Sequence, residues 1–75
     1  MTCPSPPSFD NATPININKN KKFYQPGEEV AYMCRQHYRM DGSNVVRCMT
    51  GRWIGTPTCR GVLINFYIYF LKYLK

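Results

Sequence analysis

The sequence lacks several patterns that define large classes of protein. Its 75 residues contain no Cys-x-x-Cys pair, no apolar run of membrane-spanning length and no amphipathic repeat of helical period. Acidic residues are scarce, four against ten Lys and Arg, so the formal net charge is +6. A zinc finger or ribbon, a transmembrane helix and a helical bundle are therefore not expected. The chain is also too short for a two-layer catalytic domain.

Four cysteines are the most informative residues that the chain does contain: Cys3, Cys34, Cys48 and Cys59. An even number in a short, turn-rich chain favours two disulfides and an oxidising, extracellular location. Four cysteines allow three pairings, and the sequence alone does not choose among them. A single Cys-x-x-His, ending at His37, could supply two metal ligands at best, so we expect no metal site and no cofactor.

The N-terminal segment has an unusual composition. Met1 and Thr2 lead directly into Cys3 without a basic and apolar leader, so we expect a mature piece of a larger secreted protein. Residues 3–14 contain four prolines, which favour extended, polyproline-like backbone over a central strand.

Asn11 begins a glycosylation sequon and is expected at the surface, although the proline directly after the sequon leaves its occupancy open.

Two segments alternate between apolar and polar residues. Residues 28–34 place Val30, Tyr32 and Cys34 on one face, and residues 44–49 do the same for Val46 and Cys48. A period of two is typical of a half-buried strand.

Turn residues separate these segments. Pro26-Gly27, Asp41-Gly42 and Thr50-Gly51 each predict a turn, and Asp-Gly in particular indicates a hairpin. Short strands joined by such turns predict a small all-β unit over residues 3–59. Trp53 is its largest apolar side chain, so we expect Trp53 at the centre of a thin core, against a disulfide and Tyr32.

Taken together, these residues resemble one sushi module, also called a complement control protein module or short consensus repeat. The resemblance spans residues 3–59 and is strongest to the complement factor H and factor H-related group. It rests on Cys3-Pro4, residues 26–34, Tyr38, Gly42, residues 46–48, residues 51–53 and residues 57–59. The chain departs from the family at Gln36-His37, where such modules often have a glycine before the aromatic residue.

The resemblance implies a sandwich-like module stapled by Cys3–Cys48 and Cys34–Cys59, with its termini at opposite ends. It implies a non-catalytic binding module of a secreted complement-regulatory protein, one of several tandem sister modules. Its expected partners are an activated complement component, heparan sulfate or sialylated glycans. A structural spacer and a cell-surface adhesion or receptor module are the alternatives. Nucleic acid is not an expected partner outside the cell, and no triad-like spacing suggests an enzyme.

Basic residues form two clusters within the unit: Lys19, Lys21 and Lys22, and Arg35, His37 and Arg39. The alternation of the second cluster predicts that its three side chains share one strand face. Either cluster could bind a polyanion through complementary charge, or the charges could simply be a solvated surface.

Residues 60–75 form an apolar tail that lies outside the resemblance, with 11 hydrophobic residues in the last fifteen positions. Its apolar run is far shorter than the roughly 20 residues of a spanning helix. An interfacial anchor and a dimerising strand are two interpretations. We favour a third interpretation, in which the tail is non-family sequence that was appended by alternative splicing, intron read-through or gene prediction. If the tail is ordered, we expect a short helix.

Overall fold

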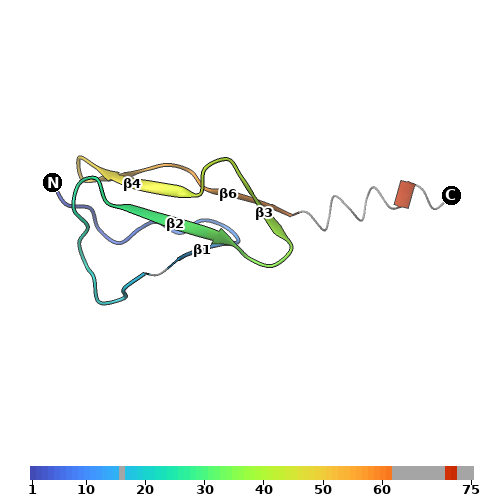
Figure 1. Ribbon diagram of the computed structural model, residues 1–75, viewed down its shortest axis with the longest axis horizontal. Coiled ribbons are helices and arrows are strands. Elements are labelled where there is room, and N and C mark those ends of the chain that lie inside the picture. The colour runs from blue at the N-terminus through green and yellow to red at the C-terminus, as the bar shows by residue number, and fades with distance from the viewer. Residues whose placement is uncertain (16, 62–70, 73–75) are drawn as a thin grey trace.

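The computed structural model describes residues 1–15, 17–61 and 71–72. Its strands form a four-stranded antiparallel sheet in the order β1 (Ala12–Pro14), β2 (Glu29–Cys34), β4 (Val45–Met49) and β5 (Arg52–Ile54). A separate two-stranded antiparallel sheet contains β3 (Tyr38–Asp41) and β6 (Thr58–Gly61). The two sheets follow one another along the module, so the N-terminus and the end of β6 lie at opposite ends (Figure 1). The expected all-β class is confirmed.

The core follows the alternation of the two central strands. Val30 and Tyr32 of β2 and Val46 and Cys48 of β4 are buried, while their neighbours along each strand are partly or fully exposed. Both faces predicted from the period of two are therefore confirmed. Tyr32 is the largest fully buried side chain, with 1% of its surface exposed.

Two disulfides connect parts of the chain that share few other links. Cys3–Cys48 ties the N-terminal segment to β4, and Cys34–Cys59 ties the end of β2 to β6 in the other sheet. This pairing is the one that the resemblance implies. With sequence separations of 45 and 25 residues, loop-closure entropy corresponds to about 4 and about 3.5 kcal/mol of stabilisation.

Aromatic side chains hold the proline-rich lead-in. The Tyr32 hydroxyl donates to the carbonyl of Pro7, and Trp53 Nε1 donates to the carbonyl of Pro4 over 2.9 Å. Phe9 packs edge-on against the Tyr32 ring, 5.1 Å between centroids. Burial raises the pKa of the Tyr32 phenol and so keeps the donor protonated. Side-chain donors thus bond to the carbonyls of a segment whose prolines have no N–H to donate to a ladder. The lead-in joins the sheet only at its end, through the short edge strand β1.

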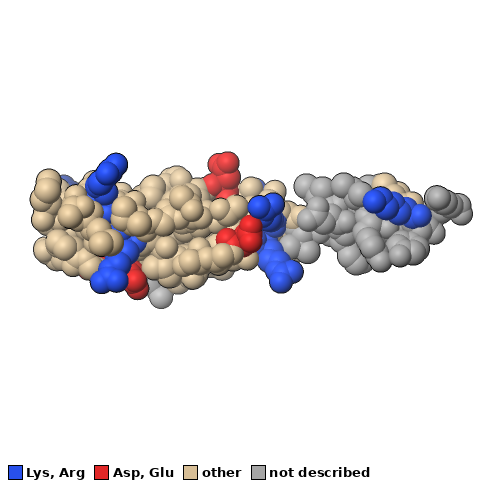
Figure 2. Space-filling view, turned by 90° about the horizontal axis from the view of Figure 1, so that it is seen from above, with Lys and Arg blue, Asp and Glu red and all other residues tan. Residues whose placement is uncertain are grey.

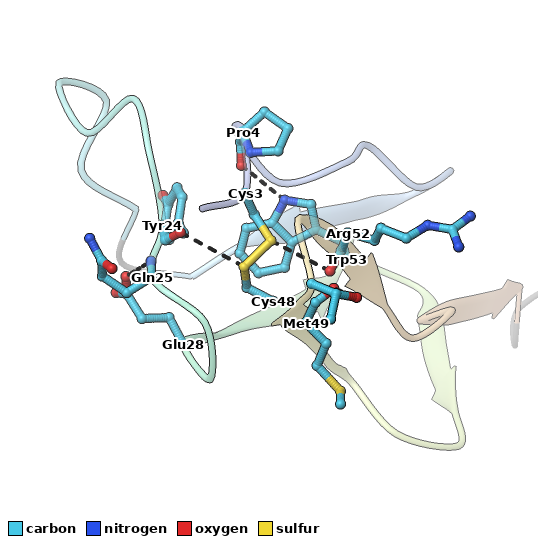
Figure 3. The surroundings of a disulfide bond; sticks show 10 residues. Cys3, Pro4, Tyr24, Gln25, Glu28, Cys48, Met49, Arg52 and Trp53 are labelled. Carbon is cyan, nitrogen blue, oxygen red and sulfur yellow. Dashed lines mark hydrogen bonds between the residues drawn. A yellow bond between two sulfur atoms is a disulfide. The ribbon is translucent and has the colours of Figure 1, made fainter. Parts of the chain in front are cut away.

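The expectation that Trp53 occupies the centre of the core is wrong. Trp53 is only partly buried, and its ring packs edge-on against Tyr24, 5.2 Å between centroids, beside the Cys3–Cys48 disulfide (Figure 3). The reason is its position on β5, a three-residue strand at the edge of the sheet, opposite Cys48. An edge strand has a neighbour on one side only, so the indole covers the disulfide instead of filling the centre.

The hairpin indicated by Asp41-Gly42 is also absent, although the chain does turn there with a φ of 85° at Gly42. The two flanking strands enter different sheets, since β3 pairs with β6 whereas β4 pairs with β2 and β5. Thr50-Gly51 instead forms a two-residue hairpin loop, because Met49 and Arg52 are cross-strand partners. Both loop residues have positive φ values, 49° and 77°, as a type I′ turn requires.

Most of the apolar tail lies outside the described residues. Of positions 62–75 the structure describes only Leu71 and Lys72, both exposed. The expectation of a short helix, and the choice among an anchor, a dimerising strand and appended sequence, therefore remain predictions.

Gly55 should be intolerant of any side chain. It has a φ of 129°, and a Cβ added there would lie 2.6 Å from the carbonyl oxygen of Val45. Gly42 has a similar strain but open space around it. We expect Gly42→Ala to cost roughly 1–3 kcal/mol from backbone strain alone and Gly55→Ala to cost clearly more. Denaturant melts of both variants measure the difference, and equal losses would show that the close approach is relieved by relaxation.

Candidate binding surface

Acidic side chains neutralise only part of the basic surface. The described residues contain two ion pairs, Lys21–Glu28 and Arg60–Asp41. Six further basic side chains between residues 17 and 61 form no ion pair with any described residue: Lys19, Lys22, Arg35, Arg39, Arg47 and Arg52. Figure 2 shows Lys and Arg side chains near both ends of the module, with Asp or Glu beside some of them.

The lysine cluster divides into one structural and two exposed residues. Lys21 Nζ bonds to the Glu28 carboxylate and lies 4.7 Å from the centre of the Tyr24 ring. Lys21 therefore ties its loop to the start of β2 and is not available as a free cation. Lys19 and Lys22 are exposed. The structure thus leaves two of the three predicted lysines available to a ligand.

Glu28 is the acceptor that organises this corner. Its carboxylate accepts from Lys21 and from the backbone N–H of Gln25. The hydrogen bond from Lys21, followed by the one from Gln25, lowers the pKa of the Glu28 carboxyl below its ordinary value of 4.5.

The second cluster does not share a strand face, contrary to the expectation. Arg35 follows the end of β2, His37 lies in the turn with a φ of 73°, and only Arg39 belongs to a strand, β3. The alternation is interrupted because the chain leaves one sheet after Cys34 and enters the other at Tyr38. His37 stands in a left-handed conformation, which glycine adopts without a steric penalty.

Arg35 makes contacts within the molecule. Its backbone N–H donates to the Asn11 carbonyl over 2.9 Å, and its Nη1 approaches Asn11 Oδ1 at 3.4 Å. The guanidinium lies 5.9 Å from the centre of the Tyr38 ring. Arg35 therefore bridges the turn before β1 and the start of β3, so its replacement would test structure and binding together.

Asn11, the proposed glycosylation site, is half-buried and has a φ of 60°. Thr13 of the same sequon is exposed on β1, at the edge of the sheet. Occupancy of the sequon stays a prediction.

Sequence reasoning missed the arginine that faces Arg39. In the β3–β6 ladder Arg39 is the direct partner of Arg60, and Asp41 reaches diagonally to Arg60 with 2.7 Å between Oδ2 and Nε. All three side chains are exposed. No sequence pattern indicated this group. Sixteen residues separate the end of β3 at Asp41 from the start of β6 at Thr58, so the pairing of the two strands has no local signal.

Within residues 1–15, 17–61 and 71–72, no three His, Cys, Asp or Glu side chains are grouped as metal ligands. Within the same ranges, no helix has the length and hydropathy needed to cross a membrane.

Comparison with known proteins identifies relatives of the module. A family model described as the sushi repeat, or SCR repeat, matches residues 3–59. Complement factor H of Bos taurus is 42% identical over 60 residues, which cover 80% of this chain and 5% of that protein. Complement factor H of Mus musculus is 43% identical over 58 residues, 77% of this chain and 4% of that protein. The human coagulation factor XIII B chain is 34% identical over 59 residues, which cover 79% of this chain and 8% of that protein. The chain thus spans less than a tenth of the length of each of these three relatives.

We expect Glu28→Gln to remove an acid-sensitive part of the stability. A carboxyl whose pKa is lowered by folding stabilises the native state above its unfolded pKa, and this contribution disappears as the pH falls through the folded pKa. The wild type should therefore lose more stability than the variant between pH 6 and roughly pH 3. Urea melts across this range measure the difference. Parallel pH profiles would contradict the role assigned to Glu28.

Replacement of His37 by glycine should stabilise the fold. A non-glycine residue in the left-handed region costs roughly 1–2 kcal/mol, so His37→Gly should raise the free energy of unfolding by about 1 kcal/mol. His37→Ala is the matched control because it removes the imidazole but keeps the Cβ. Thermal or denaturant melts compare the two variants, and an equal gain from alanine would attribute the effect to the imidazole.

Proposed function

Since the chain belongs to the sushi repeat family, we propose that it is a non-catalytic binding module of a secreted complement-regulatory protein. Its partners are an activated complement component and a polyanionic host glycan such as heparan sulfate or a sialylated glycan. The likeness to complement factor H supports the first partner. Sister modules on either side would supply further contacts in the full-length protein.

The excess of exposed basic side chains is the observation that supports glycan binding. Within residues 17–61, six Lys and Arg side chains form no ion pair, and the only two described acids outside the ion pairs are Asp10 and Glu29. Such a surface attracts anions and increases the rate at which they associate. The disulfides hold these side chains on a scaffold with little freedom to rearrange, which reduces the entropy lost on binding.

A structural spacer is the second candidate, and the position of the chain ends favours it. The N-terminus and the end of β6 lie at opposite ends of the module, the arrangement that a rod of tandem modules needs (Figure 1). A spacer sets the distance between active modules and has no ligand of its own. The two candidates differ in one measurable property, the affinity of the isolated chain.

Retention on immobilised heparin tests the glycan partner. We expect the full oxidised chain to elute above physiological ionic strength, about 0.15 M, and Lys19→Gln/Lys22→Gln to elute earlier. Lys72→Gln/Lys75→Gln is the matched control, because it removes the same charge from the tail. If both double variants shifted equally, retention would reflect net charge alone. Elution of the wild type below 0.15 M salt would favour the spacer.

The complement partner needs its own assay. We expect the chain to bind surfaces on which complement has been activated in fresh serum more strongly than surfaces treated with heat-inactivated serum. Equal binding to the two surfaces would remove the complement component from the proposal.

A further inference from the structure

Two like charges face each other across the second sheet. Arg39 of β3 and Arg60 of β6 are direct partners in the antiparallel register, and both are exposed. Side chains in such positions have Cβ atoms about 5 Å apart, and like charges there repel and destabilise the ladder. The stability of the fold therefore does not explain why two arginines occupy these paired positions.

Asp41 compensates one of the two charges and positions its side chain. Its Oδ2 lies 2.7 Å from Arg60 Nε, and the Arg60 and Asp41 side chains remain 70% and 53% exposed. This bond engages Nε and leaves the terminal nitrogens of Arg60 as donors. Arg39 forms no ion pair within residues 17–61. The face therefore keeps one net positive charge and two arginine side chains on directly paired positions of neighbouring strands.

The solvent face of this sheet is entirely polar. Its residues are Arg39 and Asp41 on β3 and Thr58 and Arg60 on β6, while Met40 and Cys59 belong to the opposite, partly buried face. Protein–protein contacts usually depend on an apolar or aromatic anchor at their centre. A face without such an anchor suits a hydrophilic, strongly charged ligand better than a protein surface.

Guanidinium groups recognise oxyanions by geometry as well as by charge. The planar fork of an arginine donates two parallel hydrogen bonds to neighbouring oxygens of one anion. Two forks on opposite strands can donate to the same tetrahedral group, and an anion between them relieves their repulsion. Figure 2 shows basic side chains gathered at the end of the module where the described chain leaves β6, with acidic side chains beside them.

We infer that Arg39 and Arg60, with Asp41 positioning Arg60, form an oxyanion site for a sulfate group of a sulfated glycan. This inference rests on the proposed glycan binding and assigns it a particular site. The site lies on the β3–β6 sheet and includes Arg60, which belongs to neither cluster seen in the sequence. Lys19 and Lys22 then lie outside this site and make a smaller contribution to glycan binding.

Binding of the full oxidised chain to a heparin oligosaccharide tests this site. Arg39→Gln/Arg60→Gln should weaken the affinity about tenfold, the loss expected when charge-assisted hydrogen bonds are removed. Lys19→Gln/Lys22→Gln removes the same charge elsewhere and should weaken it less. Arg39→Lys/Arg60→Lys keeps the charge but loses the forks, and should behave like the glutamine variant.

Two further probes separate the possible sources of the anion. Desulfated heparin and poly-glutamate, matched in chain length, should both bind more weakly than the sulfated oligosaccharide. Stronger binding of poly-glutamate would overturn the assignment to a glycan sulfate. Near-ultraviolet circular dichroism and a thiol count establish that each variant has kept its fold and both disulfides.

The outcomes distinguish this inference from the proposed function. If the wild type does not bind the heparin oligosaccharide, the proposed binding of heparan sulfate is wrong as well. If it binds but the two glutamine variants lose affinity equally, or if the lysine variant binds normally, glycan binding stands and the paired-arginine site is overturned.

Discussion

The two disulfide cross-links are the constraint on which the rest of the structure depends. Only six described hydrophobic side chains are buried, and two of them, Cys3 and Cys48, are themselves joined. A core of this size leaves a small domain marginal without covalent help. Cys34–Cys59 has a second role, because no strand of one sheet pairs with a strand of the other. It fixes the β3–β6 sheet, and therefore Arg39 and Arg60, relative to the core.

A structure supported by disulfides can use its surface charges for binding. Three basic side chains make polar contacts within the fold: Lys21 with Glu28, Arg60 with Asp41, and Arg35 with Asn11. The remaining basic side chains of residues 17–61 are exposed and form no ion pair with a described residue. Arg60 belongs to both groups, since it bonds to Asp41 and also forms part of the inferred oxyanion site.

The sequence predicted the fold better than the candidate site. Alternation placed Val30 and Tyr32 on the buried face of β2, because a strand exposes and buries side chains in strict turn. The same rule failed for Arg35, His37 and Arg39. It holds only while the chain remains in one strand, and here a left-handed residue carries the chain from one sheet into the other.

Local chemistry by itself determined the two central strands and the turns, because alternation and turn residues act over a few positions, and the even cysteine count indicated two disulfides. Tertiary structure alone decided which strands pair across long separations. It paired β3 with β6 and not with β4, although Asp41-Gly42 favours a hairpin, because Cys34–Cys59 holds β6 beside the chain that follows β2. The juxtaposition of Arg39 and Arg60 follows from that pairing, and no local pattern in the sequence contains it.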